Sequence, residues 1–187
     1  MFTMNRTKNL VLVSLFAALI AVGAFIRIPV PVVPFTLQFL FTTLAGTLLG
    51  ARLGALSVLS YLALGLFGLP IFAGGGGPAY ILQPTFGYLI GFAVGAFVTG
   101  ALTSLSPDRS VKRLFVANLA GLLMVYAFGL LYCWCIYTVY IGTGIGLWVL
   151  FLHGFLLTFP SDLALCAVAA ILGKRLIPLV TKGATAR

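Results

Sequence analysis

An apolar stretch at residues 61–92 is broken in its middle by proline and by four consecutive glycines, residues 74–77. The sequence on either side predicts two apolar helices, the second beginning at Pro84, because proline is well tolerated in the first helical turn. A link between two membrane-spanning helices needs only a few polar residues. The long, apolar and glycine-rich link at residues 69–83, called loop 3 below, instead indicates backbone packed closely against another group. We take that group to be a ligand.

The composition identifies the solvent in which these helices fold. Hydrophobic residues make up 62% of the 187-residue chain and charged residues 7%. Soluble domains average about 45–50% apolar and about 25% charged residues, so the chain is predicted to be an integral membrane protein. A membrane-spanning helix takes roughly 20 apolar residues, which allows about six helices with short connections. We therefore expect a single all-α membrane domain, residues 1–187, with six transmembrane helices.

Proline and glycine set the expected helix boundaries. Five helices are predicted at residues 9–28, 36–50, 54–68, 84–105 and 114–137. The basic start and apolar run of the first also resemble a signal peptide, but the run is too long and lacks a small-residue cleavage site, so we expect a retained helix. The sixth is either one kinked helix at residues 146–177 or a short re-entrant segment followed by a helix that begins near Pro160. We favour the second, because Pro160, Ser161 and Asp162 form a helix-start signature.

The charge distribution predicts the orientation in the membrane. Eleven Lys and Arg residues oppose two acidic residues. Such an excess is found in proteins that bind nucleic acid or anionic surfaces, but in a membrane chain basic residues also mark the cytoplasmic side. With six crossings, every basic residue except Arg27 falls on the side of the two termini. We therefore expect cytoplasmic termini, no nucleic-acid partner, and an external loop 3 together with the loops that follow the first and fifth helices.

Asp162 is the only acidic residue expected at membrane depth. A carboxylate there costs several kcal/mol unless it is paired, so it is a functional candidate. In the first turn of a helix, its ionised form is favoured by roughly 0.3–1 kcal/mol. An acceptor of this kind suits a ligand that presents N–H donors. The alternative is a capping acid that bonds only to its own helix.

Other reactive residues do not assemble into a catalytic or metal site. His153 is the only histidine, and Cys133, Cys135 and Cys166 lack the spacing of zinc ligands or of a disulfide framework. No Lys-Ser or Lys-Thr pair follows the glycine run, which excludes a phosphate-binding loop. One histidine and two aspartates cannot supply a nucleophile, a base and an orienting acid. We expect neither enzymatic activity nor a bound cofactor.

Two further features leave alternatives open. Ala17 and Ala21 are small residues four positions apart in the first helix, a spacing that lets helices approach closely in lipid. They serve either internal packing or the docking of a separate membrane subunit. Aromatic residues such as Tyr80 and Tyr88 gather near the expected outer helix ends. Most fit the aromatic belt of an interface, and one or two could line an apolar ligand pocket.

Four stretches together carry a family resemblance: PVPVVPFTLQFL, LLGARLGALSVLSYLALGLFGLPIFAGGGG, PTFGYLIGF and FPSDL. Over nearly its whole length the chain resembles the BioY family, the biotin-binding S-components of energy-coupling factor (ECF) transporters of prokaryotic cell membranes. The resemblance implies a six-helix protein that binds biotin near its outer face. It also implies a transmembrane coupling subunit, docked at Ala17 and Ala21, and two cytoplasmic subunits that hydrolyse ATP.

The resemblance implies roles for particular residues. The position of Asp162 contacts the ureido ring of biotin in the family, and loop 3 closes over the ligand. The loop residues expected at the ligand are Gly74, Gly75, Gly76 and Gly77, with Gln38, Gln83 and Tyr88 beside them.

The chain also departs from the family pattern at three positions. Leu165 stands where the family usually has lysine, and Gln83 and Phe86 replace glycines. Gln38 and Gln83 offer neutral donors and acceptors in place of the missing cation. The candidate ligands are biotin and, alternatively, another small vitamin or biotin-like compound.

Overall fold

A computed structural model describes residues 6–28, 35–105 and 108–185. Most of the proline-rich segment after the first helix and two residues of the hydrophilic loop before the fifth lie outside these ranges. The structure consists of α1 (Arg6–Phe25), β1 (Arg27–Ile28), β2 (Phe35–Thr36), α2 (Gln38–Leu49), α3 (Ala51–Leu66), a 3₁₀ helix (Pro78–Leu82), α4 (Phe86–Ser104), α5 (Val111–Cys135), a π-helix (Ile136–Ile141), α6 (Leu147–Phe151), a second π-helix (Leu152–Leu156) and α7 (Phe159–Thr185).

The predicted membrane bundle is confirmed. Four helical runs have the length and apolarity to cross a membrane: Arg6–Phe25, Phe86–Ser104, Val111–Ile141 and Leu147–Val180. The shorter apolar helices Gln38–Leu49 and Ala51–Leu66 bring the number to six. The remaining regular structure is small, because β1 and β2 form a two-residue antiparallel ladder. The chain is therefore an all-α, multi-pass membrane protein.

The predicted start of the last helix near Pro160 is confirmed, because α7 begins at Phe159. α6, the second π-helix and a two-residue turn lead directly into α7, so that Leu147–Val180 is one run long and apolar enough to cross a membrane. The run is irregular where Pro160 supplies no N–H for the preceding turn, and regular α-helix resumes at Phe159. The backbone N–H of Asp162 already bonds to the carbonyl oxygen of Thr158 at 3.0 Å. Asp162 therefore lies in the first turn of α7, as predicted, but its N–H is already bonded to the preceding turn.

The start of α4 also differs from the prediction. α4 begins at Phe86 and not at Pro84, since Pro84 and Thr85 form a turn before it. The N–H groups of Phe86 and Tyr88 bond to the carbonyl oxygens of Gln83 and Thr85, at 3.0 and 3.1 Å. This turn brings Gln83 and Tyr88 to the same end of α4.

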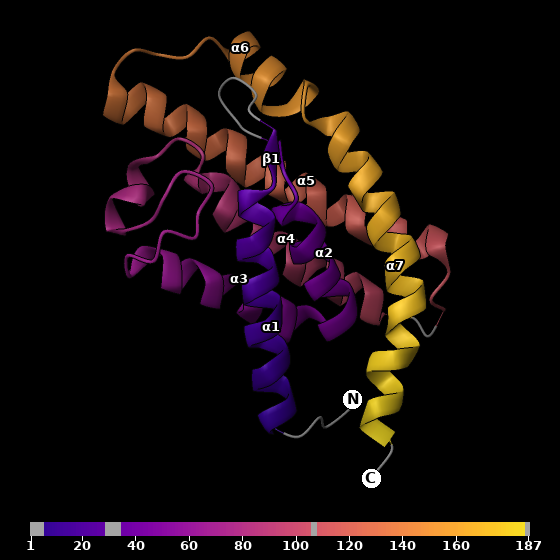
Figure 1. The fold of residues 1–187 in the computed structure, drawn as a ribbon. Coiled ribbons are helices and arrows are strands. Elements are labelled where there is room, and N and C mark those ends of the chain that lie inside the picture. The colour runs from indigo at the N-terminus through magenta and orange to yellow at the C-terminus, as the bar shows by residue number, and fades with distance from the viewer. Residues whose placement is uncertain (1–5, 29–34, 106–107, 186–187) are drawn as a thin grey trace.

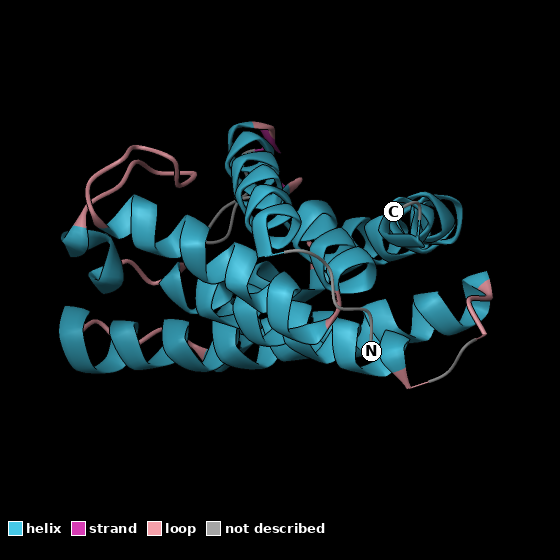
Figure 2. Cartoon of the chain, turned by 90° about the horizontal axis from the view of Figure 1, so that it is seen from below, coloured by secondary structure: helices cyan, strands magenta, loops and turns pink. Residues whose placement is uncertain are grey.

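The start of α1 and the end of α7 lie at the same edge of the molecule (Figure 1). The Nζ of Lys8 on α1 contacts the carbonyl oxygen of Val180 on α7, at 3.5 Å. Seen from below, α7 is viewed nearly end-on beside the C-terminus, while other helices lie across the view (Figure 2). The helices of the bundle thus cross at large angles.

The centre of the bundle is the contact between α4 and α5, which glycine makes close. A Cβ at Gly91 would lie 2.8 Å from the Cα of Val125, too near for any side chain. Close backbone approach drives helix association in lipid, where apolar burial gives no advantage.

Ala17 belongs to the core of the chain itself. It is 5% exposed and packs in the main buried cluster, and Ala21 is partly buried against the same cluster. Of the two roles that the sequence left open, internal packing is the one that this burial supports.

Candidate functional site

A cavity of about 250 Å³ lies where α2, α4, α5 and α7 meet loop 3 and the β1–β2 ladder. Its lining residues are Arg27, Thr36, Gln38, Phe39, Ala73, Gly74, Tyr80, Gln83, Thr85, Tyr88, Leu89, Phe92, Leu122, Val125, Tyr126, Thr158 and Asp162. Apolar and aromatic walls with a few convergent polar groups are typical of small-molecule sites, and the volume is near their lower limit of about 300 Å³.

Asp162 is held at the cavity wall by α5. The hydroxyl of Tyr126 donates to Oδ2 of Asp162 at 2.5 Å and lies 3.0 Å from Oγ1 of Thr158. Thr158 also donates to the carbonyl oxygen of Phe155 at 3.3 Å. Among the described residues, the side-chain hydrogen bond of Asp162 involves Oδ2, so Oδ1 is available as an acceptor, and Asp162 is one of the residues that line the cavity.

Asn118 fixes the helix that carries Asp162. This fully buried residue of α5 donates through Nδ2 to the carbonyl oxygen of Cys166, one turn beyond Asp162, at 3.0 Å. Its Oδ1 accepts from the Thr47 hydroxyl of α2 at 3.2 Å. An amide buried in the bundle without hydrogen-bond partners would cost free energy, and both groups of the Asn118 amide are bonded. Asn118 therefore links α2 and α7 to α5. The position of Asp162 is therefore set by the bundle and not by a loop.

Gln38 lines the cavity, but its polar atoms bond to the protein. Its Oε1 accepts from Thr36 at 3.2 Å, and its Nε2 donates to the hydroxyl of Tyr61 at 2.7 Å. Tyr61, fully buried, donates in turn to the carbonyl oxygen of Ile71 in loop 3 at 3.1 Å. In the structure Gln38 thus supports loop 3 from α2, and the second N–H of its amide is the group it has left for a ligand.

Only the first glycine of loop 3 lines the cavity. The N–H of Gly74 bonds to the Tyr80 hydroxyl at 3.3 Å. The N–H of Gly77 bonds instead to the carbonyl oxygen of Gly65 on α3, at 2.7 Å. A Cβ at Gly76 would lie 2.1 Å from the carbonyl oxygen of Leu69. Gly75, Gly76 and Gly77 are not among the lining residues. The close backbone approach indicated by the glycine run is therefore made to the chain itself.

Of the three positions that depart from the family pattern, Gln83 lines the cavity together with Tyr88, whereas Phe86 and Leu165 pack in the protein core. Tyr88 donates to the carbonyl oxygen of Gly154 at 3.0 Å. Phe86 is buried and packs against the rings of Tyr80 and Tyr132, at centroid distances of 6.5 and 6.0 Å. Leu165 packs against the main core cluster.

Sequence reasoning missed several polar residues of the cavity lining, among them Tyr126, Thr158 and Arg27. Thr158 lies four residues before Asp162, so helical spacing places both on one face, and that signal could have found it. Tyr126 reaches Asp162 only through the packing of two helices distant in sequence, which no local pattern shows. Arg27 was noticed only as the one basic residue on the far side of the membrane.

Comparison with known proteins decides the family. The sequence model described as the BioY family matches residues 1–182. The chain belongs to the BioY family. This BioY chain is 46% identical over 176 residues to a probable biotin transporter BioY of Lysinibacillus sphaericus, covering 94% of this chain and 90% of the relative. A second, from Pyrococcus horikoshii, is 39% identical and covers 91% and 97%.

A solved structure has the same fold. It is the crystal structure of the S-component for biotin from an ECF-type ABC transporter, with a TM-score of 0.80, 26% identity and 94% coverage of both chains. The fold, the family and the cavity therefore agree on a membrane protein of the BioY type.

Proposed function

We propose that this BioY protein binds biotin from outside the cell as the S-component of an ECF-type uptake transporter. The observation that carries the proposal is the position of Asp162, whose Oδ1 is available as an acceptor, in a mostly apolar cavity of a BioY-family bundle. The ureido ring of biotin presents two N–H donors, for which a fixed acceptor at this depth is the matching group. The remainder of biotin is mostly apolar, as are the cavity walls.

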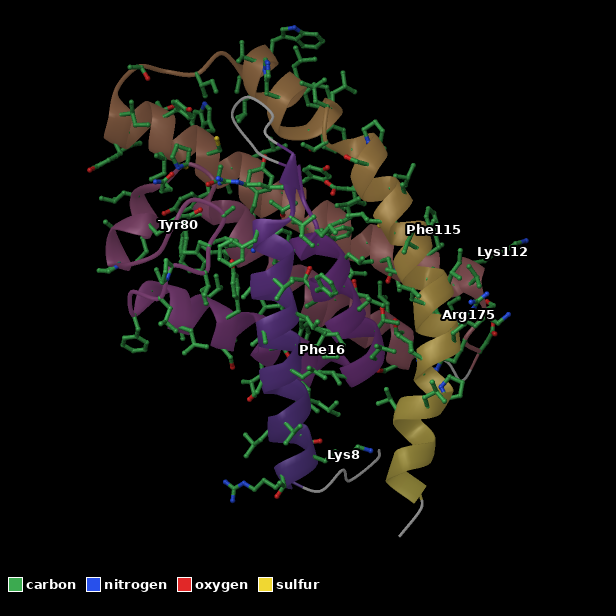
Figure 3. All side chains as sticks on the ribbon, viewed as in Figure 1. Lys8, Phe16, Tyr80, Lys112, Phe115 and Arg175 are labelled. Atoms are coloured by element: carbon green, nitrogen blue, oxygen red, sulfur yellow. The ribbon has the colours of Figure 1, made fainter. Side chains whose placement is uncertain are left out.

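The proposed direction of transport rests on charge. Lys8, Lys112 and Arg175 lie along the lower and right-hand side of the molecule, whereas Tyr80 of loop 3 lies on the left (Figure 3). Basic residues favour the cytoplasmic side, so we infer that both termini are cytoplasmic and that the cavity opens outward beneath loop 3.

Energy would come from partner subunits. Relatives named as transporters and a structural neighbour from an ECF-type transporter support a coupling subunit and two cytoplasmic ATPases as partners. Since Ala17 is buried, a docked helix would meet α1 mainly through its exposed small neighbours Ser14 and Ala18. Ala21, partly buried, would lie at the edge of that contact.

Equilibrium binding of tritiated biotin to the detergent-purified chain tests the proposal. Saturable binding at micromolar concentration or tighter, competed by unlabelled biotin, is expected. Riboflavin and thiamine at the same concentrations serve as competitors that should not displace it. If another small vitamin competes and biotin does not, the alternative ligand class replaces biotin at this site.

A further inference from the structure

One basic side chain reaches the cavity. Of the described residues that line it, Arg27 is the only one with a positive charge, and Asp162 is the only one with a negative charge. Arg27 is exposed and belongs to β1, at the loop side of the cavity, whereas Asp162 belongs to α7. The cavity thus has a cationic and an anionic wall.

The backbone of Arg27 is anchored on both sides. Arg27 pairs with Thr36 in the β1–β2 ladder, and the N–H of Leu37 bonds to the carbonyl oxygen of Ile26 at 3.2 Å. The side chain crosses to loop 3, where Nη1 donates to the carbonyl oxygen of Ala73. This is the one bond of the Arg27 side chain among the residues that the structure describes. A guanidinium carries five N–H donors, so it has capacity for a further acceptor.

We propose that Arg27 recognises the carboxylate of the transported ligand. The inference rests on the proposed function and adds the residue that binds the carboxylate at the opposite end of biotin from the ureido ring. A ligand carboxylate beside Asp162 would be repelled, so the charges of the cavity orient an amphiphilic ligand with its N–H donors at Asp162 and its carboxylate at Arg27. The planar fork of arginine matches both oxygens of a carboxylate.

The test compares biotin with its primary carboxamide, which keeps the ring and the chain but lacks the charge. Wild-type protein should bind biotin about 10- to 100-fold more tightly than the amide, as expected for loss of one charge-assisted contact. Arg27→Gln should bind both ligands with nearly equal affinity. Asp162→Asn, the matched control, should weaken both ligands while it keeps the wild-type preference for biotin.

The outcomes separate the inference from the function on which it depends. If Arg27→Gln weakens both ligands by the same factor, Arg27 only holds loop 3 and the inference is wrong. Equal binding of biotin and amide by the wild type also overturns it, yet leaves biotin transport standing. Wild-type protein that binds neither ligand refutes the proposed function instead.

A second variant guards against a folding defect. Folding of each variant is checked by size-exclusion chromatography and thermal unfolding in detergent. Arg27→Lys keeps the charge but loses the fork, and should reduce the preference for biotin by at least about threefold. If Arg27→Gln does not fold, Arg27→Lys decides alone. An unchanged preference of Arg27→Lys for biotin over the amide would count against Arg27 as the carboxylate contact.

Discussion

The two walls of the cavity are built in different ways. The helical wall, formed by Tyr126, Thr158 and Asp162, lies on helices whose relative positions are fixed by buried groups such as Asn118. The loop wall, formed by Arg27, Ala73, Gly74 and Tyr80, consists of connecting segments. Most of its hydrogen bonds are local backbone bonds, such as those between Phe72 and Gly75. Single side chains also tie loop 3 to the bundle, as from Tyr61 to Ile71 and from Tyr132 to Ile81.

This difference separates two tasks. A site placed on packed helices is more precise than one on loops, so the helical wall can hold an acceptor at a fixed position. Connecting segments open locally at lower cost than packed helices, so we infer that the loop wall admits and releases a ligand. A change in affinity is a change in the ratio of the release rate to the association rate. We therefore expect changes in the helical wall to act through the release rate, in proportion to the affinity, and changes in the loop wall to act on the association rate as well.

Asp162→Asn should have the largest effect. The neutral amide is a weaker acceptor and turns an N–H₂ group toward the donors of the ligand, so biotin affinity should fall about 10- to 100-fold. Titration calorimetry or equilibrium binding measures the change. Asp108→Asn is the matched control, because that carboxylate bonds to Ser110 in a loop outside the cavity. Equal affinities of the two variants would remove Asp162 from the site.

Gly76→Ala tests the loop wall. Because its Cβ would meet the carbonyl oxygen of Leu69 at 2.1 Å, loop 3 must shift. Overpacking costs typically about 1–3 kcal/mol, so affinity should fall about tenfold, through a faster release of ligand. Gly146→Ala, at a position where the nearest atom outside the adjacent residues is 3.9 Å away, is the control. Stopped-flow kinetics that show unchanged release rates would contradict a mobile loop wall.

The sequence predicted the helical framework better than the site, for a physical reason. Lipid requires long apolar helices, so the six segments can be read from composition and from proline and glycine. An evenly apolar helix carries little information about which face turns inward. The sequence therefore left open whether Ala17 packs inside the chain or docks a partner, and the docking role came from the family resemblance; the structure buries Ala17.

The site illustrates the same limit. Asp162 is conspicuous because an intramembrane acid is rare, and its helix partner Thr158 follows from spacing. Tyr126 cannot be found in this way, since its contact joins residues 36 positions apart in the chain. Loop 3 was predicted to pack closely against a ligand. The sequence did not reveal that Gly76 packs against Leu69, or that Gly75 and Gly77 form backbone hydrogen bonds within the chain, instead of lining the cavity.

Tyr126→Phe tests whether the helical wall is the rigid part of the site. Removing the hydroxyl leaves Oδ2 of Asp162 without the donor that fixes it, while the ring packing with Phe155 and Phe159 remains. A lost hydrogen bond of about 1 kcal/mol corresponds to about fivefold weaker biotin binding, with the loss greatest for ligands that contact Asp162. Tyr140→Phe, at a residue 61% exposed, provides the control in the same binding assay. A change in release rate larger than the change in affinity would show that this wall also moves.

Tyr132→Phe should have the smallest effect and bears most directly on the division of tasks. Its hydroxyl ties the rigid α5 to the 3₁₀ helix of loop 3 through the carbonyl oxygen of Ile81, at 2.5 Å in an exposed position. Water can replace such a bond, so its loss should cost only about 0.5 kcal/mol, or about a twofold change. If the loop wall is the moving part, that change should appear in both rates measured by stopped flow. A pure affinity effect, with the association rate unchanged, would mean that α5 positions loop 3 as firmly as it positions Asp162, and the two walls would then form one rigid site.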